Sequence, residues 1–274
     1  MKKYIRALSI AGFDGSGGAG IQADLKTFSA LNCYGMTALT SLPIQNTTGV
    51  LKIYDLPNES IAEQISAIIE DIGVDVIKIG MLHRPEIIEI VHTKLIECST
   101  VPIITDPVMF AKSGDLLLQE VALEALKSKI LPISTIITPN IYEAQYLSGL
   151  KIISKNDMII AAKKISIYGS GFIVIKGGHL EKEEDCWDLL YDCKNQKSDW
   201  FSNKRIQTKN LHGTGCTFSA AIASYIGNKF SIYNAVKNAN SYINKAIVSG
   251  SKYKLGKGFG PVDHFYFMEE TKCK

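Results

Sequence analysis

The residues best suited to chemistry form two glycine-rich segments, GFDGSGGAG at 12–20 and HGTGC at 212–216. Glycines before a helix leave backbone N–H groups free to bind an anion, and the helix dipole strengthens the attraction. The second segment ends in Cys216, and a helix N-terminus favours the thiolate. We therefore predict an anion-binding cup at Gly213 and Gly215. A lowered thiol pKa would make Cys216 a base for a hydroxyl nucleophile.

Three charged residues follow predicted strands and add to this chemistry. Lys176 precedes two glycines, Asp106 lies in TDPVM, and Glu143 lies in TPNIYEA. A lysine beside glycines can reach a phosphate as a point charge. Mg²⁺ needs one or two carboxylates when phosphate oxygens and water complete its shell. With the anion cup, these residues predict phosphoryl transfer from a magnesium–nucleotide.

The first glycine-rich segment also contains G-x-G-x-x-G at Gly15, Gly17 and Gly20. A dinucleotide site requires an acidic residue about 20 positions later for the ribose, and the predicted strand 35–45 has none. Asp14 would repel a pyrophosphate, and a Walker loop is excluded because G-K-[S/T] does not follow. A ligand-facing loop fits better, with a glycine-lined structural turn as the alternative.

The elements that position these residues alternate along the chain. Apolar segments of strand length alternate with segments of helical periodicity, which predicts a mostly parallel sheet with helices on both faces, in one domain spanning 1–274. The predicted strands are 4–12, 35–45, 75–81, 102–109, 134–140 and 171–178, followed by a hairpin over 186–206. The predicted helices are 21–32, 59–72, 84–98, 115–131, 141–150, 155–169, 215–228 and 231–250.

The ends of the predicted strands define the expected site, because open α/β sheets bind ligands beyond the carboxyl ends of their strands. The residues at these ends are Asp14, Gln45, Met81, Asp106, Asn140 with Glu143, and Lys176.

The bulk composition excludes several classes of protein. The 274 residues are 46% hydrophobic and 21% charged, as expected for a globular protein, and the net charge of +3 gives no reason to expect nucleic acid. We expect no membrane span, because an apolar run of about 18 residues is missing. The six cysteines are widely spaced without C-x-x-C. We interpret them as reduced thiols in a cytoplasmic protein.

Several motifs occur in an order that resembles a known family. They include AGFDGSGGAGIQADLKTFSALNCYGMTALTSLPIQNTTGV, KIGML, TDPVMFAKSGDLLL, IITPNIYEA, IKGGH, NLHGTGCTFSAAIASY and GKGFGPVDHF. Over nearly the whole chain the sequence resembles the hydroxymethylpyrimidine/phosphomethylpyrimidine kinases of thiamine biosynthesis, in the ribokinase-like superfamily. The resemblance implies a three-layer α/β/α fold, usually a homodimer. It also implies phosphorylation of 4-amino-5-hydroxymethyl-2-methylpyrimidine, and then of its monophosphate, by Mg²⁺ and ATP.

The resemblance assigns a substrate side to the site. Gln45 matches the glutamine that hydrogen-bonds the pyrimidine, and Met81 and Val108 match apolar contacts to the ring. Asp14 and Ala19 lie in the loop that closes over the substrate, with Asp14 as its polar contact.

The resemblance also assigns a phosphate side. Gly213, Gly215 and Cys216 match the anion hole and the candidate base, a position where other ribokinase relatives carry Asp. Asp106 and Glu143 match the acids that hold magnesium and phosphate. The nucleotide side comprises Lys176, Thr208, Lys209, Asn140 and Gly178.

Three departures from the family pattern keep alternatives open. Phe13 and Gly15 flank Asp14 where relatives usually have Ser or Thr before it and Pro or Ser after it, and Asn240 stands where many have Lys. A pyridoxal kinase of the same cysteine-containing subgroup is the main alternative. Gln45 favours the pyrimidine, since pyridoxal needs a different partner for its phenolic oxygen. A non-catalytic metabolite-binding protein and a nicotinamide oxidoreductase are the alternatives from other classes.

Overall fold

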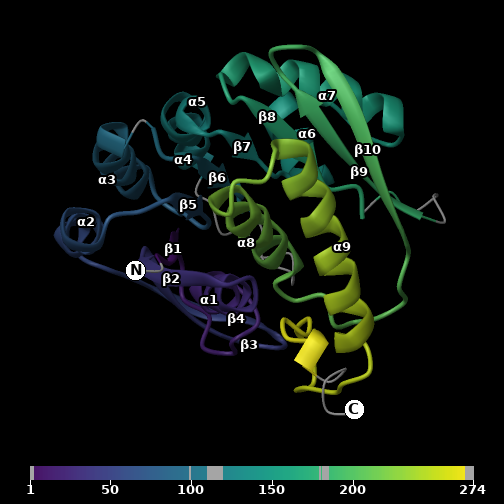
Figure 1. The fold of residues 1–274 in the computed structure, drawn as a ribbon, viewed down its shortest axis with the longest axis horizontal. Helices are drawn as coiled ribbons and strands as arrows, with labels where there is room; N and C mark the ends of the chain where they lie inside the picture. The colour runs from purple at the N-terminus through teal and green to yellow at the C-terminus, as the bar shows by residue number, and fades with distance from the viewer. Residues whose placement is uncertain (1–2, 99, 110–119, 179, 181–184, 269–274) are drawn as a thin grey trace.

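A computed structural model describes residues 3–98, 100–109, 120–178, 180 and 185–268. Its centre is an eight-stranded sheet in the order β10-β9-β8-β7-β6-β5-β1-β2 (Figure 1). Strand β9 is antiparallel to both of its neighbours, β8 and β10, and all other neighbouring strands pair in parallel. The strands are β1 (Ile5–Ala11), β2 (Cys33–Leu39), β5 (Val76–Ile79), β6 (Ile103–Thr105), β7 (Ile136–Ile137), β8 (Phe172–Ile175), β9 (Asp185–Asp192) and β10 (Lys197–Lys204). The mostly parallel sheet and the 186–206 hairpin are confirmed.

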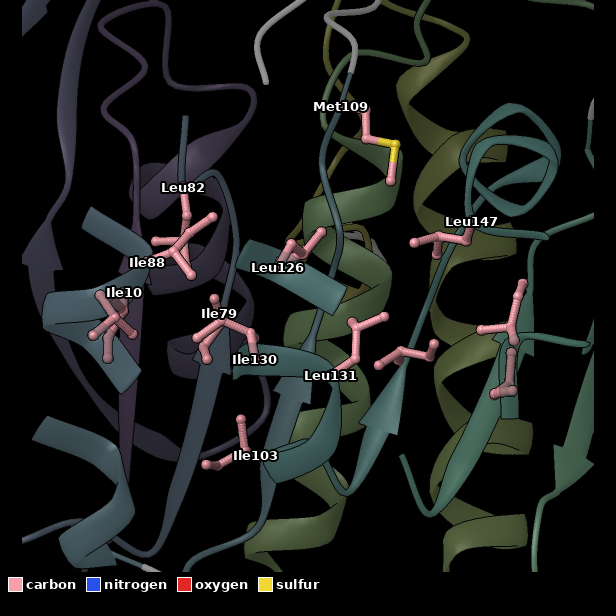
Figure 2. Packing of buried hydrophobic residues seen from close by; sticks show 14 of the residues in the cluster. Ile10, Ile79, Leu82, Ile88, Ile103, Met109, Leu126, Ile130, Leu131 and Leu147 are labelled. Carbon is pink, nitrogen blue, oxygen red and sulfur yellow. The ribbon is translucent and has the colours of Figure 1, made fainter. Parts of the chain in front are cut away.

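Helices cover both faces of this sheet, because alternate residues of its buried strands point to opposite faces. Ile77 and Ile79 of β5 pack in one apolar cluster, while Val76 packs in the other. Figure 2 shows part of the first cluster, where Ile10, Ile79 and Ile103 lie near side chains from the covering helices. The expected three-layer α/β/α arrangement is therefore confirmed.

The helices divide between the two clusters. The first is covered by α2 (Asn58–Ala67), α3 (Pro85–Leu95), α4 (Glu120–Ala125), α5 (Leu131–Ile133), α6 (Ile141–Ser148) and α7 (Lys155–Ile165). The second is covered by α1 (Gly20–Ala30), α8 (Thr214–Gly227) and α9 (Ile232–Gly250). Shorter helical turns occupy Ile68–Ile72, Ile96–Cys98, Leu126–Ile130 and Ser166–Tyr168. The predicted helix 115–131 lies outside the described residues over 115–119. Among the helices that are described, none is long and apolar enough to cross a bilayer.

The predicted strand 35–45 is wrong as one element. The chain leaves the large sheet after β2, and β3 (Ser41–Asn46) pairs instead with β4 (Gly49–Asp55), a strand that the sequence analysis missed. Thr40 marks the break, since its N–H donates to the Ala11 carbonyl and its hydroxyl to the Met81 carbonyl. Pro43 within β3 suits an edge strand, because proline donates no ladder hydrogen bond. Gln45 is therefore carried by a hairpin outside the main sheet.

Candidate active site

The predicted strand-end residues meet around one cavity of about 1150 Å³. It lies beyond the carboxyl ends of the parallel strands, as expected for an open α/β sheet. The predicted residues that line it are Ala19, Gln45, Met81, Asp106, Val108, Asn140, Glu143, Lys176, Gly178, Gly213, Gly215 and Cys216.

The predicted anion cup forms the N-terminus of α8. Gly213 is the N-cap with φ +78°, and no side chain caps the helix. A Cβ at Gly213 would lie 1.7 Å from the Gly18 carbonyl oxygen, so the two glycine-rich segments touch. A Cβ at Gly215 would lie 3.2 Å from Asp106 Oδ2 and 3.3 Å from Lys176 Nζ. The first-turn N–H groups, which lack intrahelical partners, are thus placed beside a buried charge pair.

Lys176, Asp106 and Glu143 form a charge cluster next to this cup. Lys176 Nζ lies 2.7 Å from Asp106 Oδ1, which also accepts a hydrogen bond from Thr138 Oγ1 at 3.1 Å. Burial alone would lower the pKa of Lys176, but Asp106 and Glu143 outweigh it and raise that pKa. Burial raises the pKa of Glu143 to about 7, with Lys176 opposing and Asp106 adding to the rise. The lysine therefore stays charged where a phosphate would bind.

Asp106 and Glu143 provide hard oxygen donors of the kind that Mg²⁺ prefers. Within the described ranges, no group of three or more His, Cys, Asp or Glu could hold a metal alone. A magnesium shared with phosphate oxygens needs fewer protein ligands, and a cation would relieve the repulsion that Asp106 exerts on Glu143. Glu143 also has a structural contact, since its Oε2 accepts from the Asn140 N–H at 2.7 Å in a capping box of α6. The donor set fits a nucleotide-bound magnesium.

Cys216 lies in the first turn of α8 and is half-buried in the cavity wall. The predicted lowering of its pKa is wrong: burial raises the pKa of the thiol to about 11. Lys78 and a hydrogen bond from the Gly20 N–H oppose this rise, while Asp24 and Asp106 add to it. Removing a thiolate from water costs more free energy than the attraction of the helix N-terminus provides.

A second part of the cavity lining, the substrate wall, carries the predicted substrate residues. Gln45 donates from Nε2 to the Phe13 carbonyl at 3.3 Å, which links the β3–β4 hairpin to the glycine-rich loop. Met81 follows β5 and Val108 follows β6, and both line the cavity. Phe13, one of the departures from the family pattern, lines it too. This wall is more apolar than the phosphate side.

Asp14 has a different place from the one expected for a direct substrate contact. It is fully buried and lies outside the cavity lining. Its Oδ1 accepts from the Ser16 N–H and hydroxyl at 2.9 and 2.7 Å. Its Oδ2 accepts from the Gly18 and Ala19 N–H groups at 3.1 and 2.7 Å, and lies 2.8 Å from His212 Nε2. Loop contacts occupy both oxygens, so Asp14 organises the loop and ties it to HGTGC.

The nucleotide side is less well predicted. Thr208 and Lys209 follow β10 outside the cavity lining, and Thr208 Oγ1 accepts from the Asn210 N–H at 3.1 Å. Arg205, which the sequence analysis missed, lines the cavity and donates to the Gly178 carbonyl at 2.7 Å. A basic residue shortly before the anion cup was the available signal.

Asn240 replaces the expected lysine with a neutral hydrogen-bonded group. Its Nδ2 donates to Asp188 Oδ2 at 2.9 Å, and its Oδ1 accepts from Asn203 Nδ2 at 2.7 Å. The other Asp188 oxygen accepts from the Gly177 N–H at 2.9 Å. All these residues except Gly177 line the cavity. Through Asp188, Asn240 is thus linked to the backbone of Gly177, the residue after Lys176.

The fold and the site together define a ribokinase-like small-molecule kinase, with a glycine-lined helix start and a largely buried lysine–aspartate pair at the carboxyl edge of a mostly parallel sheet. Residues 14–263 match the phosphomethylpyrimidine kinase family, and the chain belongs to this family. The hydroxymethylpyrimidine/phosphomethylpyrimidine kinase of Escherichia coli is 40% identical over 265 residues, which are 96% of this chain and 98% of that protein.

Two solved structures add to this comparison. The phosphomethylpyrimidine kinase of Clostridium difficile has a TM-score of 0.78 at 42% identity, covering 89% of this chain and 99% of that one. The pyridoxal kinase of Staphylococcus aureus in complex with AMP-PCP and pyridoxal has a TM-score of 0.87 at 37% identity, covering 97% of this chain and 96% of that one. Both substrate classes are therefore represented among similar folds.

Proposed function

We propose that this chain phosphorylates 4-amino-5-hydroxymethyl-2-methylpyrimidine, and then its monophosphate, in thiamine biosynthesis, with ATP as donor. One observation carries the proposal: a single cavity is lined by Gln45, by Cys216 and by Gly215, which lies beside the Lys176–Asp106 pair. The family and the E. coli relative support the pyrimidine as substrate. The AMP-PCP complex of the S. aureus kinase supports an adenine nucleotide.

The substrate wall orients the pyrimidine. The Gln45 amide hydrogen-bonds the polar edge of the ring, while Met81 and Val108 contact its apolar faces. This arrangement directs the hydroxymethyl group toward Cys216 at the start of α8. Holding the two reactants in a fixed geometry supplies much of the rate of a phosphoryl transfer.

The phosphate wall stabilises the charge of the transferred phosphoryl group. The N–H groups of Gly215 and Cys216 donate to its oxygens, and Lys176 neutralises part of its charge. Asp106 and Glu143 would hold Mg²⁺ through the nucleotide phosphates, and a bound magnesium supplies charge neutralisation there.

Cys216 acts as the base of the first reaction. Burial keeps the thiol largely protonated at neutral pH, and its minor thiolate form accepts the proton from the substrate hydroxyl as the oxygen attacks the phosphoryl group. The second reaction differs, because its acceptor is a phosphate monoester whose second pKa is about 6 and which is already ionised at neutral pH. The base is therefore needed for the alcohol and not for the monophosphate.

Pyridoxal phosphorylation is a second candidate activity. The pyridoxal kinase of S. aureus is structurally closer than the phosphomethylpyrimidine kinase of C. difficile, with TM-scores of 0.87 and 0.78. Gln45 favours the pyrimidine, since the phenolic oxygen of pyridoxal needs a different partner.

A turnover assay on three acceptors tests these assignments. ADP release is measured with the pyrimidine alcohol, its monophosphate and pyridoxal under identical conditions. We expect the highest kcat/KM for the pyrimidine alcohol and measurable turnover of the monophosphate. A higher kcat/KM for pyridoxal would reverse the assignment. Absence of ADP release with all three would indicate a metabolite-binding protein.

We also propose that the chain acts as a homodimer in the cytoplasm. The exposed apolar side chains of the β3–β4 hairpin, Ile44, Leu51 and Tyr54, support a protein contact. The free thiols of the described cysteines suit a reducing compartment. Light scattering during size-exclusion chromatography tests the dimer, and a mass of one chain would refute it.

A further inference from the structure

Three polar residues interrupt the apolar layer between the sheet and α1. Ser9 of β1 and Lys78 of β5 are register partners in adjacent parallel strands, and both are fully buried. Asp24 of α1 is buried over them. The neighbouring apolar residue Leu25 is only half-buried, whereas Asp24 takes the inner position.

These residues form a charged contact without access to water. Lys78 Nζ lies 2.8 Å from Asp24 Oδ2, with both side chains 0% exposed, and Ser9 Oγ donates to the same oxygen at 2.5 Å. The other oxygen, Asp24 Oδ1, has no hydrogen-bond partner in the described structure. Burying a charge pair is costly, and well-packed apolar residues often stabilise a fold as well or better. Stability alone therefore does not account for this pair.

The pair lies near the proposed catalytic base, because the Gly20 N–H donates to the Cys216 thiol and Asp24 lies about one turn further along α1. Lys78 and Cys216 both line the cavity, and α8, which begins beside Cys216, packs against β5 and α1. Lys78 Nζ reaches the carboxyl end of its strand, since a Cβ at Gly80 would lie 2.9 Å from it. The ammonium group is thus between the sheet and the first turn of α8.

We infer that Lys78, held in place by Asp24, is a positioning residue whose ammonium group stabilises the thiolate of Cys216. The inference rests on the proposed function, in which Cys216 is the base. It assigns a role to a buried charge that no other step of the proposed reaction uses. Lys176, by contrast, lies beside Gly215 and neutralises the phosphate itself.

The charges around Cys216 support a stabilisation of its thiolate by Lys78. Burial is the largest influence and raises the pKa of the thiol, and Lys78 is the largest influence that lowers it. Burial would also lower the pKa of Lys78, but the attraction of Asp24, Cys216 and Asp106 outweighs it and raises that pKa. Lys78 therefore stays protonated. The groups that face Cys216 are Lys78 from β5, Asp24 and the Gly20 N–H from α1, Asp106 after β6, and Lys176 after β8.

The reactivity of the Cys216 thiol tests the inference without relying on catalysis. A thiolate attacks iodoacetamide, forming a carbon–sulfur bond and releasing iodide, so the rate reports the ionised fraction. Alkylation of the Cys216 peptide is followed by mass spectrometry as a function of pH. The variant Lys78→Met with Asp24→Asn removes both charges, so no unpaired charge remains buried. We expect its Cys216 to react about tenfold more slowly at neutral pH, because a rise of about one unit in the pKa lowers the thiolate fraction about tenfold.

A second ion pair supplies the matched control. Arg6 and Asp75 lie 2.8 Å apart at the other end of β1, and their side chains are partly exposed. Arg6→Met with Asp75→Asn removes a pair at the start of the adjacent strands β1 and β5 without changing the charges near Cys216. This control should keep the alkylation profile of the wild type. An unchanged profile in the Lys78/Asp24 variant would overturn the inference.

A single variant keeps the test usable if the double variant does not fold. Lys78→Gln removes only the ammonium group and retains a polar side chain beside Asp24, so Cys216 should react more slowly than in the wild type. A purely structural pair predicts no such decrease, and unchanged or faster alkylation would count against the inference. Kinase turnover is measured in parallel. If alkylation slows in the double variant while phosphorylation of the alcohol is unchanged, Lys78 does stabilise the thiolate but Cys216 is not the base.

Discussion

The two walls of the cavity are built in different ways. On the phosphate wall, Asp106 and Lys176 directly follow the parallel strands β6 and β8, and Gly215 lies in the first turn of α8. The substrate wall adds the 12–20 loop and the β3–β4 hairpin, neither of which belongs to the large sheet, to Met81 and Val108 after β5 and β6. Sheet and helix termini thus fix the charged groups, while segments outside the sheet form much of the recognition surface. Catalysis needs the phosphate groups in a preorganised geometry, whereas a substrate wall can change with the ligand.

A few contacts join the two walls. Asp14 of the loop contacts His212, the residue before the anion cup, and Gly213 packs against the Gly18 carbonyl. At the tip of the hairpin, the Thr47 carbonyl accepts from the Phe259 N–H at 2.7 Å. The walls can therefore be perturbed separately, and their connection can be perturbed as well.

Cys216→Ala should give the largest effect and should separate the two reactions. We expect kcat for the alcohol to fall by about 10²–10⁴-fold, the usual contribution of a general base. Turnover of the monophosphate should fall much less, because its acceptor oxygen is already ionised. Steady-state kinetics with both acceptors gives the ratio, with Cys193→Ala, which lies outside the cavity lining, as the control. Equal losses for both acceptors would contradict the role of a base.

Lys176→Met should lower the rate of both reactions. The variant removes the point charge from the transferred phosphoryl group and leaves Asp106 without its ion-pair partner. We expect a loss of about 10²–10³-fold in kcat, comparable to removing one donor from an anion hole. Initial rates with each acceptor measure it, and Lys163→Met on an exposed surface is the control. A selective loss for one acceptor would place Lys176 on the substrate side instead.

The phosphate wall was largely predictable from the sequence because its groups obey local rules. A lysine or an acid directly after a buried strand must lie at the carboxyl edge of the sheet, and a glycine-rich segment before a helix marks an anion site. The pKa of Cys216 was not predictable. It depends on burial and on Lys78 and Asp24, which come from two other elements. A lysine inside the apolar run VIKI was the available signal.

The substrate wall was less predictable because it depends on contacts between distant segments. The run from Gly35 to Gln45 has the apolar pattern of one strand, and the break at Thr40 follows from hydrogen bonds to Ala11 and Met81. Asp14 was predicted to face the substrate from its place at a strand end. Its partners in the folded loop take up both oxygens, and sequence spacing does not reveal such an arrangement.

Gln45→Leu should act on binding and leave the phosphate wall intact. A leucine leaves a polar edge of the buried pyrimidine unpaired, which costs about 1–3 kcal/mol. We expect KM for the pyrimidine alcohol to rise accordingly, with a small change in kcat and none in KM for ATP. Lys52→Leu, an exposed position on the same hairpin outside the cavity lining, is the control. An unchanged KM would remove Gln45 from the substrate contacts.

Asp14→Asn should have the smallest effect, on stability, and tests the connection between the walls. Burial opposes ionisation of Asp14, but hydrogen bonds from His212, Ser16 and Ala19 outweigh it and hold the pKa at about 2, below the ordinary 3.8. A carboxylate with a lowered folded-state pKa stabilises the fold above its unfolded pKa, and this contribution is lost as the pH falls through about 2.

The variant should therefore be less stable than the wild type by about 2 kcal/mol at pH 7, and the gap should narrow below pH 4. Urea unfolding at pH 7, 4 and 3 measures it, with the exposed Asp199→Asn as the control. A gap that stays constant over this range would mean that the ionised carboxylate of Asp14 is not what joins the loop to the anion cup. The wall connection would then depend on the close packing of Gly213 against Gly18.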